Sequence, residues 1–298
     1  MKRIFFLMSI ALALVCSSAK AGTPEVKDAG DSKYVVSVGD VKLTVDASKG
    51  AKILSFKYKD SEVISQMQRP NAFGSTFWPS PQAAWNWPPI PEYDSRPYEV
   101  KLDGSSITLT SSLSQRFPYR VIKNIKPDAK DNSIVVTYTL KNESDKEQTV
   151  APWEITRVPG EGLIFFDAPL DKITPANTPL LIDFKSQFGL AWYEYDTAEE
   201  NRKINADGKG WYGYVNNGLL LVKKFDDLKA GQPAPGEAEI QIYVDRGKTF
   251  IELEAQGEYK TLKAGESLSW SVRWYLVPAK AAAYPSKTLA KQVKKIVK

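Results

Sequence analysis

Short stretches of alternating apolar and polar residues run through most of the chain. Every second side chain in such a stretch is apolar, which is typical of a β-strand with one buried face. Glycine, proline, asparagine and aspartate separate the stretches, as in turns. The clearest predicted strands are residues 34–38, 41–45, 53–58, 106–110 and 134–140. Many short strands without a low-complexity linker predict one all-β domain over residues 22–278, a sandwich of large antiparallel sheets.

Only the end of the chain has a clear helical pattern. Ser286 is a suitable helix cap, and Leu289, Val293 and Ile296 follow it at helical spacing. We therefore expect a short helix within a basic tail over residues 279–298. Its lysines are interpreted as a solvated face rather than a membrane anchor.

The first residues have the pattern of an export signal. Lys2 and Arg3 precede an apolar run over residues 4–15, which is too short to span a bilayer. The triplet Ala-Lys-Ala that ends at Ala21 is a suitable cleavage site for a signal peptide of residues 1–21. We therefore expect a periplasmic or secreted protein that begins at Gly22 and has no stable membrane insertion.

Cys16 is the only cysteine of the chain. A lipoprotein would carry its lipid on this residue, but the bulky Val15 stands where such a signal has a small residue. We expect instead that Cys16 leaves with the signal peptide. The mature chain then has neither a disulfide nor a thiolate metal site, and its stability depends on a large core.

The composition excludes several kinds of chemistry. The chain has no histidine, so Ser-His-Asp and Cys-His catalysis and histidine-ligated metal sites are ruled out in their usual forms. The aspartates lack the spacing of a calcium loop, and we expect no metal and no cofactor. The formal net charge is +5, and the lysines are scattered rather than clustered, so no nucleic acid partner is expected.

Residues 70–97 depart from the strand pattern, because this segment holds seven prolines and three tryptophans. Proline removes ladder donors, so we expect a long loop rather than a central strand. In one interpretation the indole rings stack on sugar rings while polar neighbours donate hydrogen bonds. In the other, the loop caps the sandwich and buries its tryptophans, and both remain open. The candidates for binding a saccharide are Trp78, Gln82, Trp85, Asn86, Trp87 and Arg96 in this segment, together with Arg157 and Arg273 further along the chain.

Two sequence motifs carry a resemblance to a known group of proteins. The motif GSTFWPSPQ over residues 74–82, followed by WNWPP over residues 85–89, resembles a widespread uncharacterised family of exported bacterial proteins. That family is similar to galactose mutarotase in its expected fold. The second motif runs from IELEAQG over residues 251–257 to WSVRW over residues 270–274. It looks like the glutamate strand and the final strand of aldose and hexose-phosphate epimerases.

The resemblance implies a β-supersandwich with a concave sheet face that binds a sugar. It also implies a glutamate that takes the anomeric hydroxyl proton and a histidine that protonates the ring oxygen. Glu254 matches the position of that glutamate. The strand that would carry the histidine spans residues 149–157 and offers Glu154 and Arg157 instead. A protonated Glu154 could supply the proton, whereas an arginine essentially cannot.

The strand pattern near the C-terminus places two acids together. Glu252 and Glu254 share one face of a predicted strand over residues 250–255. Arg273 lies on the polar face of a second strand over residues 268–276, and we expect the two polar faces to lie side by side. Arg157, Glu154 and Arg273 are then neighbours of Glu254. The alternative is a solvated outer face with weak surface ion pairs.

Three classes of function remain open. The first is a carbohydrate-binding protein with a mutarotase-like pocket but without standard epimerase chemistry, which the absence of histidine favours. The second is an aldose 1-epimerase-like enzyme with Glu254 as base and Glu154 as acid. The third is a structural envelope protein whose tryptophan-rich segment contacts a partner. The sequence identifies neither the sugar nor the oligomeric state.

Overall fold

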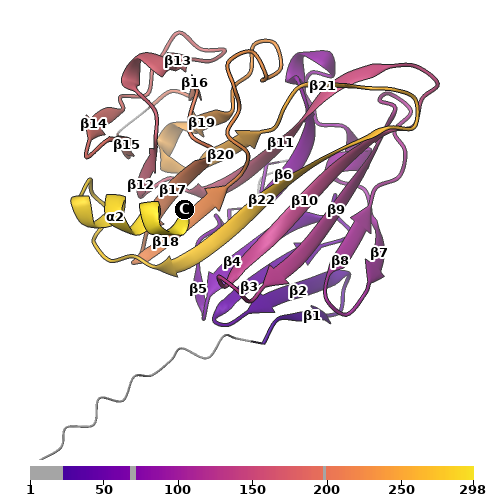
Figure 1. The fold of residues 1–298 in the computed structure, drawn as a ribbon, viewed down its shortest axis with the longest axis horizontal. Helices are drawn as coiled ribbons and strands as arrows, with labels where there is room; N and C mark the ends of the chain where they lie inside the picture. The colour runs from indigo at the N-terminus through magenta and orange to yellow at the C-terminus, as the bar shows by residue number, and fades with distance from the viewer. Residues whose placement is uncertain (1–22, 68–71, 197–198) are drawn as a thin grey trace, which may run out of the picture.

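Two large antiparallel sheets face each other in the computed structural model, which describes residues 23–67, 72–196 and 199–298 (Figure 1). The predicted signal peptide over residues 1–21 lies outside these residues. Apolar side chains of both sheets form a shared core, which explains the alternating pattern of the sequence. The predicted all-β antiparallel architecture is therefore confirmed. No helix in the described part of the chain is long and apolar enough to cross a membrane.

The first sheet has twelve strands among the described residues. Its main path runs in the order β1-β2-β3-β4-β6-β11-β20-β19-β16-β13, with β5 paired to β4 and β21 paired to β11. The strands are β1 (Glu25–Asp28), β2 (Lys33–Val38), β3 (Val41–Asp46), β4 (Lys52–Tyr58), β5 (Ser61–Glu62), β6 (Ser75–Ser80), β11 (Gln148–Pro159), β13 (Ile173–Pro175), β16 (Arg202–Ala206), β19 (Ile240–Val244), β20 (Phe250–Gln256) and β21 (Lys260–Leu262).

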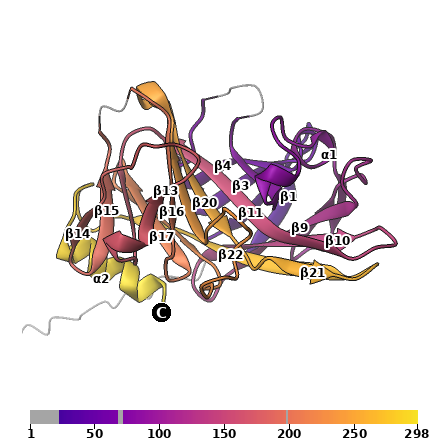
Figure 2. The same cartoon turned by 90° about the horizontal axis from the view of Figure 1, so that it is seen from above.

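The second sheet has ten strands among the same residues, in the order β14-β15-β12-β17-β18-β22-β10-β9-β8-β7. They are β7 (Glu99–Leu102), β8 (Ile107–Thr110), β9 (Tyr119–Asp128), β10 (Ser133–Asn142), β12 (Leu163–Phe166), β14 (Lys185–Gln187), β15 (Leu190–Glu194), β17 (Trp211–Asn216), β18 (Leu219–Lys224) and β22 (Ser267–Pro278). The view from above follows β10 and β22 along most of the length of the molecule (Figure 2).

Helices are few and short, as the sequence predicted. The helix α2 (Lys287–Ile296) begins after Ser286, whose hydroxyl accepts a hydrogen bond from the Leu289 backbone N–H at 3.3 Å. Its apolar side packs on the outer face of the second sheet, where Leu289 and Val293 are buried. The other helical turns are η1 (Gln82–Ala84), α1 (Pro91–Asp94), η2 (Leu170–Lys172) and η3 (Arg246–Lys248).

The proline-rich segment contains a central strand, so the expectation of a loop throughout was wrong. Strand β6 lies between β4 and β11, and each of its residues is buried. Pro79 stands directly opposite Pro152 of β11. Two prolines can face each other there because alternate residue pairs of an antiparallel ladder exchange no hydrogen bonds. The rest of the segment forms η1, α1 and their connections.

The last two long strands do not form a hairpin with adjacent polar faces, and this expectation was also wrong. Strand β20 lies between β11 and β19 in the first sheet, whereas β22 lies between β18 and β10 in the second. After β20 the chain forms β21, which pairs with β11, before it enters the other sheet. Arg273 is therefore separated from Glu254, and its guanidinium donates to Asp128 at 2.8 Å.

Candidate functional site

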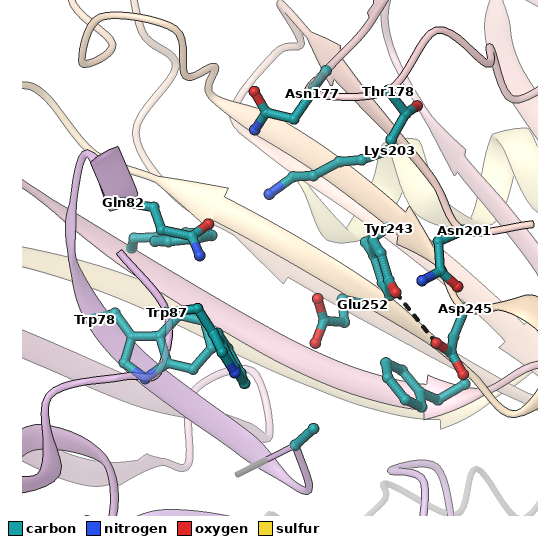
Figure 3. A pocket seen from close by; sticks show the side chains of 14 residues that line it. Trp78, Gln82, Trp87, Asn177, Thr178, Asn201, Lys203, Tyr243, Asp245 and Glu252 are labelled. Atoms are coloured by element: carbon teal, nitrogen blue, oxygen red, sulfur yellow. Dashed lines mark hydrogen bonds between the residues drawn. The ribbon is translucent and has the colours of Figure 1, made fainter. Parts of the chain in front are cut away.

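A pocket of about 480 Å³ lies on the face of the first sheet that points away from the second sheet (Figure 3). Its walls come from the end of β6 and the segment after it, from β11, β16, β19 and β20, and from the chain after β13. The residues that line it are Ala72, Trp78, Gln82, Trp87, Trp153, Ala176, Asn177, Thr178, Asn201, Lys203, Tyr243, Asp245, Phe250 and Glu252.

Strand register brings the polar floor of this pocket together. Directly opposed residues of an antiparallel sheet project to the same face. One row across β11, β20, β19 and β16 consists of Arg157, Glu252, Tyr243 and Lys203. The apolar residues between them in sequence, such as Leu253, point into the core. The alternation that builds the core therefore also builds the site.

Tryptophans form one wall of the pocket. Trp78 is buried, and its ring meets those of Trp87 and Trp153 edge to face at 6.0 and 5.3 Å. Trp87 remains 56% exposed at the rim. Trp85 is buried behind Trp78 and donates from its indole N–H to the Pro79 carbonyl at 2.8 Å. Trp85 is therefore buried as the second interpretation expected, whereas stacking of the exposed Trp87 on a sugar stays a prediction.

Asp94 fixes the orientation of the Trp78 ring. Its carboxylate accepts the Trp78 indole N–H at 2.9 Å and forms a buried ion pair with Lys52 at 2.7 Å. Gly50 lies against the same turn with φ of +67°, and a Cβ at this position would be 2.0 Å from the Asp94 carbonyl oxygen. Only glycine fits there without moving α1. No motif in the sequence pointed to Asp94.

Glu252 is one of two carboxylates that line the pocket, the other being Asp245. Its Oε1 lies 2.7 Å from Arg157 Nη2, and its side chain is 15% exposed. Arg157 is almost fully buried, with its guanidinium 5.9 Å from the Trp78 ring and 6.0 Å from the Phe250 ring. The arginine was expected beside Glu254, but it pairs with Glu252.

Glu254 lies beneath the pocket rather than in its lining. Its Oε2 accepts the Trp153 indole N–H at 2.8 Å and the Lys203 ammonium at 2.9 Å. Its Oε1 is buried without a hydrogen-bond partner. Burial raises the pKa of the Glu254 carboxyl to about 7, against the attraction of Lys203. Lys203, which sequence reasoning missed, lines the pocket (Figure 3) and pairs with this acid.

Glu154 lies on the opposite face of β11, so its expected place beside Glu254 was wrong. It is fully buried between the sheets, where Tyr138 Oη donates to it at 2.6 Å and Lys223 forms an ion pair with it. Burial lowers the pKa of Lys223 to about 8. The cause is strand alternation: Trp153 faces the pocket, so the next residue points into the core. This acid has no path to a ligand in the pocket.

Three other predicted binding residues do not line the pocket. Asn86 is exposed in a left-handed conformation with φ of +57°. Arg96 is exposed and pairs with Glu92 at 2.7 Å, one helical turn earlier in the chain. Arg273 belongs to the second sheet. Of the predicted binding residues, the pocket lining contains Trp78, Gln82 and Trp87.

The pocket combines apolar ring faces with closely spaced polar groups. Tyr243 Oη donates to Asp245 at 3.2 Å, and amides and a hydroxyl from Asn177, Asn201 and Thr178 point toward the same space (Figure 3). Such a mixture suits a ligand with both apolar faces and many hydroxyl groups. In the described part of the chain, no group of three or more Asp, Glu, His or Cys side chains could hold a metal ion.

Comparison with known proteins gives structural but not sequence matches. No protein-family model matches the sequence, and no curated protein matches it. A galactose mutarotase-like protein from Lactobacillus casei ATCC 334 has 14% identity and a TM-score of 0.60, over 85% of this chain and 99% of that one. A galactose mutarotase-like protein from Clostridium acetobutylicum has 12% identity and a TM-score of 0.53, over 87% and 99%.

A candidate aldose 1-epimerase from Klebsiella pneumoniae subsp. pneumoniae has 14% identity and a TM-score of 0.55, over 91% of this chain and 85% of that one. At such identities the likeness concerns the fold alone. It agrees with the resemblance carried by the tryptophan-proline and glutamate motifs. The chain therefore has the galactose mutarotase-like fold.

Proposed function

We propose that this protein binds carbohydrate in the pocket between Trp87 and Lys203, without the standard chemistry of an epimerase. The observation that carries the proposal is the exposed Trp87 ring at the rim of a polar pocket. The exposed indole presents an apolar ring face beside the polar groups of the pocket. Indole rings stack on the apolar faces of sugars, and Glu252 and Asn177 lie within the same pocket to bind hydroxyl groups.

The acid–base pair of a standard epimerase has no counterpart in this pocket. The sequence contains no histidine to protonate a ring oxygen. Glu154, the expected substitute, is buried between the sheets, and Glu254 is covered by Trp153 and Lys203. General acid–base catalysis needs a group within hydrogen-bond reach of the transferred proton. These placements support binding over turnover.

Titration of tryptophan emission, with calorimetry, tests the proposal directly. Wild-type protein would be titrated with glucose, galactose, mannose, N-acetylglucosamine and their oligosaccharides. We expect at least one sugar to shift the emission, because Trp78 and Trp87 line the pocket. The Trp87→Ala variant should bind that sugar more weakly while it unfolds at the same denaturant concentration. If no mono- or oligosaccharide binds wild type, the proposal fails and a structural envelope role is favoured.

An aldose 1-epimerase-like activity is the second candidate. The lining of the pocket implies a different catalytic base from the Glu254 that the sequence suggested. Glu252, unlike Glu254, lines the pocket, and it is paired with Arg157. Polarimetry of freshly dissolved aldoses should show no acceleration by wild type. An acceleration lost in Glu252→Gln and kept in Glu254→Gln would establish the enzyme and overturn the binding-only proposal.

A further inference from the structure

A second pocket of about 290 Å³ lies on the same face of the first sheet. Asn205, Thr174 and Glu237 belong to its lining, and Lys229 lies at its edge in the segment before β19. Neither the proposed function nor the sequence motifs involve this pocket. The pocket of about 480 Å³ described above is called the tryptophan pocket here. Strand β16 and the chain around β13 contribute residues to both pockets.

The two pockets are adjacent along β16 and β13. Lys203 lines the tryptophan pocket and Asn205, two residues later on the same face, lines the second pocket. Two residues of a strand span about 7 Å, which is on the scale of one sugar ring. The chain that forms and follows β13 repeats the arrangement, because Thr174 lines the second pocket and Ala176 lines the first.

A hydrogen-bonded polar cluster forms the boundary between the pockets. The Gln82 backbone N–H donates to Glu237 at 3.2 Å, which joins the segment after β6 to the segment before β19. Gln241 donates to Asn205 at 2.6 Å and to Glu237 at 3.0 Å, and Gln256 donates to Glu237 at 3.1 Å. Gln241 and Gln256 are buried and Glu237 and Asn205 are half-buried, and a network with its partners satisfied holds its members in place. The boundary is therefore a fixed polar surface.

From these contacts we infer that the ligand is an oligosaccharide of at least two sugar units, with one unit in the tryptophan pocket and the next in the second pocket. The inference rests on the proposed function. A hydroxyl-rich chain suits this path, because polar side chains continue from Lys203 through Asn205 to Lys229. A free monosaccharide would occupy only the tryptophan pocket and would leave the second pocket solvated.

Calorimetry with matched sugars of increasing length tests the inference. The probes are glucose, galactose, mannose and N-acetylglucosamine, each with its di-, tri- and tetrasaccharides. We expect the best disaccharide or trisaccharide to bind at least about tenfold more tightly than its monosaccharide, since a second unit adds contacts. Equal affinity at all lengths would overturn the inference and leave the proposed function intact. If no sugar of any length binds, the proposed function itself fails.

Two variants locate the added affinity. Asn205→Ala and Lys229→Ala should each reduce binding of the oligosaccharide by about threefold to tenfold and leave monosaccharide binding unchanged. Lys260→Ala, an exposed lysine on β21 away from both pockets, is the matched control and should bind like wild type. If only oligosaccharides bind wild type, the same losses support the inference. Wild-type oligosaccharide affinity in both pocket variants would overturn it.

Discussion

Replacement of Glu254 by glutamine should change how the stability of the protein depends on pH. Burial raises the folded-state pKa of this carboxyl from 4.5 to about 7. The folded protein then holds this proton more tightly than the unfolded chain, so the contribution of Glu254 to stability is fully present below pH 4.5 and is lost as the pH rises toward 7. A shift of this size corresponds to roughly 3 kcal/mol. Glutamine resembles the protonated acid, so the variant should keep this stability as the pH rises.

The assay is urea unfolding followed by tryptophan emission, at intervals from about pH 4.5 to pH 8. The unfolding free energy of Glu254→Gln minus that of wild type should rise by about 3 kcal/mol across this range. Burial also raises the pKa of Glu239 to about 7, but this acid is present in both proteins and cancels in the difference. A difference that stays constant with pH would refute the argument that burial raises the pKa of Glu254.

Three further predictions concern other parts of the molecule. Trp87→Ala should weaken binding of the best sugar by about 1–3 kcal/mol in calorimetry. Trp85→Ala should instead lower the unfolding free energy by about 3–5 kcal/mol, because that ring is buried. The reverse pattern would contradict the assignment of the two rings. Lys223→Met should lower the unfolding free energy by about 3–5 kcal/mol, because it leaves Glu154 as an unpaired buried charge, and a loss below 1 kcal/mol in urea unfolding would contradict this. The exported protein should begin at Gly22, and an intact mass that includes earlier residues would exclude cleavage at this site.

Alternation of apolar and polar residues was sufficient to predict the architecture. Strands β2, β3, β4, β8 and β10 appear where the pattern placed them, because a half-buried strand needs one apolar face whatever its partners are. The cap at Ser286 and the spacing after it likewise identified α2, since these signals act within one helical turn. The same alternation along one strand placed Glu252 and Glu254 on one face.

What the sequence could not determine is which strands lie next to each other. Alternation shows which residues of a strand share a face, but not which strand lies beside it. Arg273 was therefore expected beside Glu254, although β20 and β22 belong to different sheets. It also could not show that Glu154 points into the core, because that depends on which face of β11 meets the second sheet.

The candidate site combines both kinds of information. Trp78, Gln82 and Trp87 were found from composition, because tryptophans and prolines gathered in one segment are conspicuous in the sequence. Lys203 and Tyr243 came from strands with no distinctive motif, and only the register of β16 and β19 brings them to the pocket. Local chemistry therefore determined the strands and the aromatic segment, whereas contacts between distant parts of the chain decided which residues meet in the pocket.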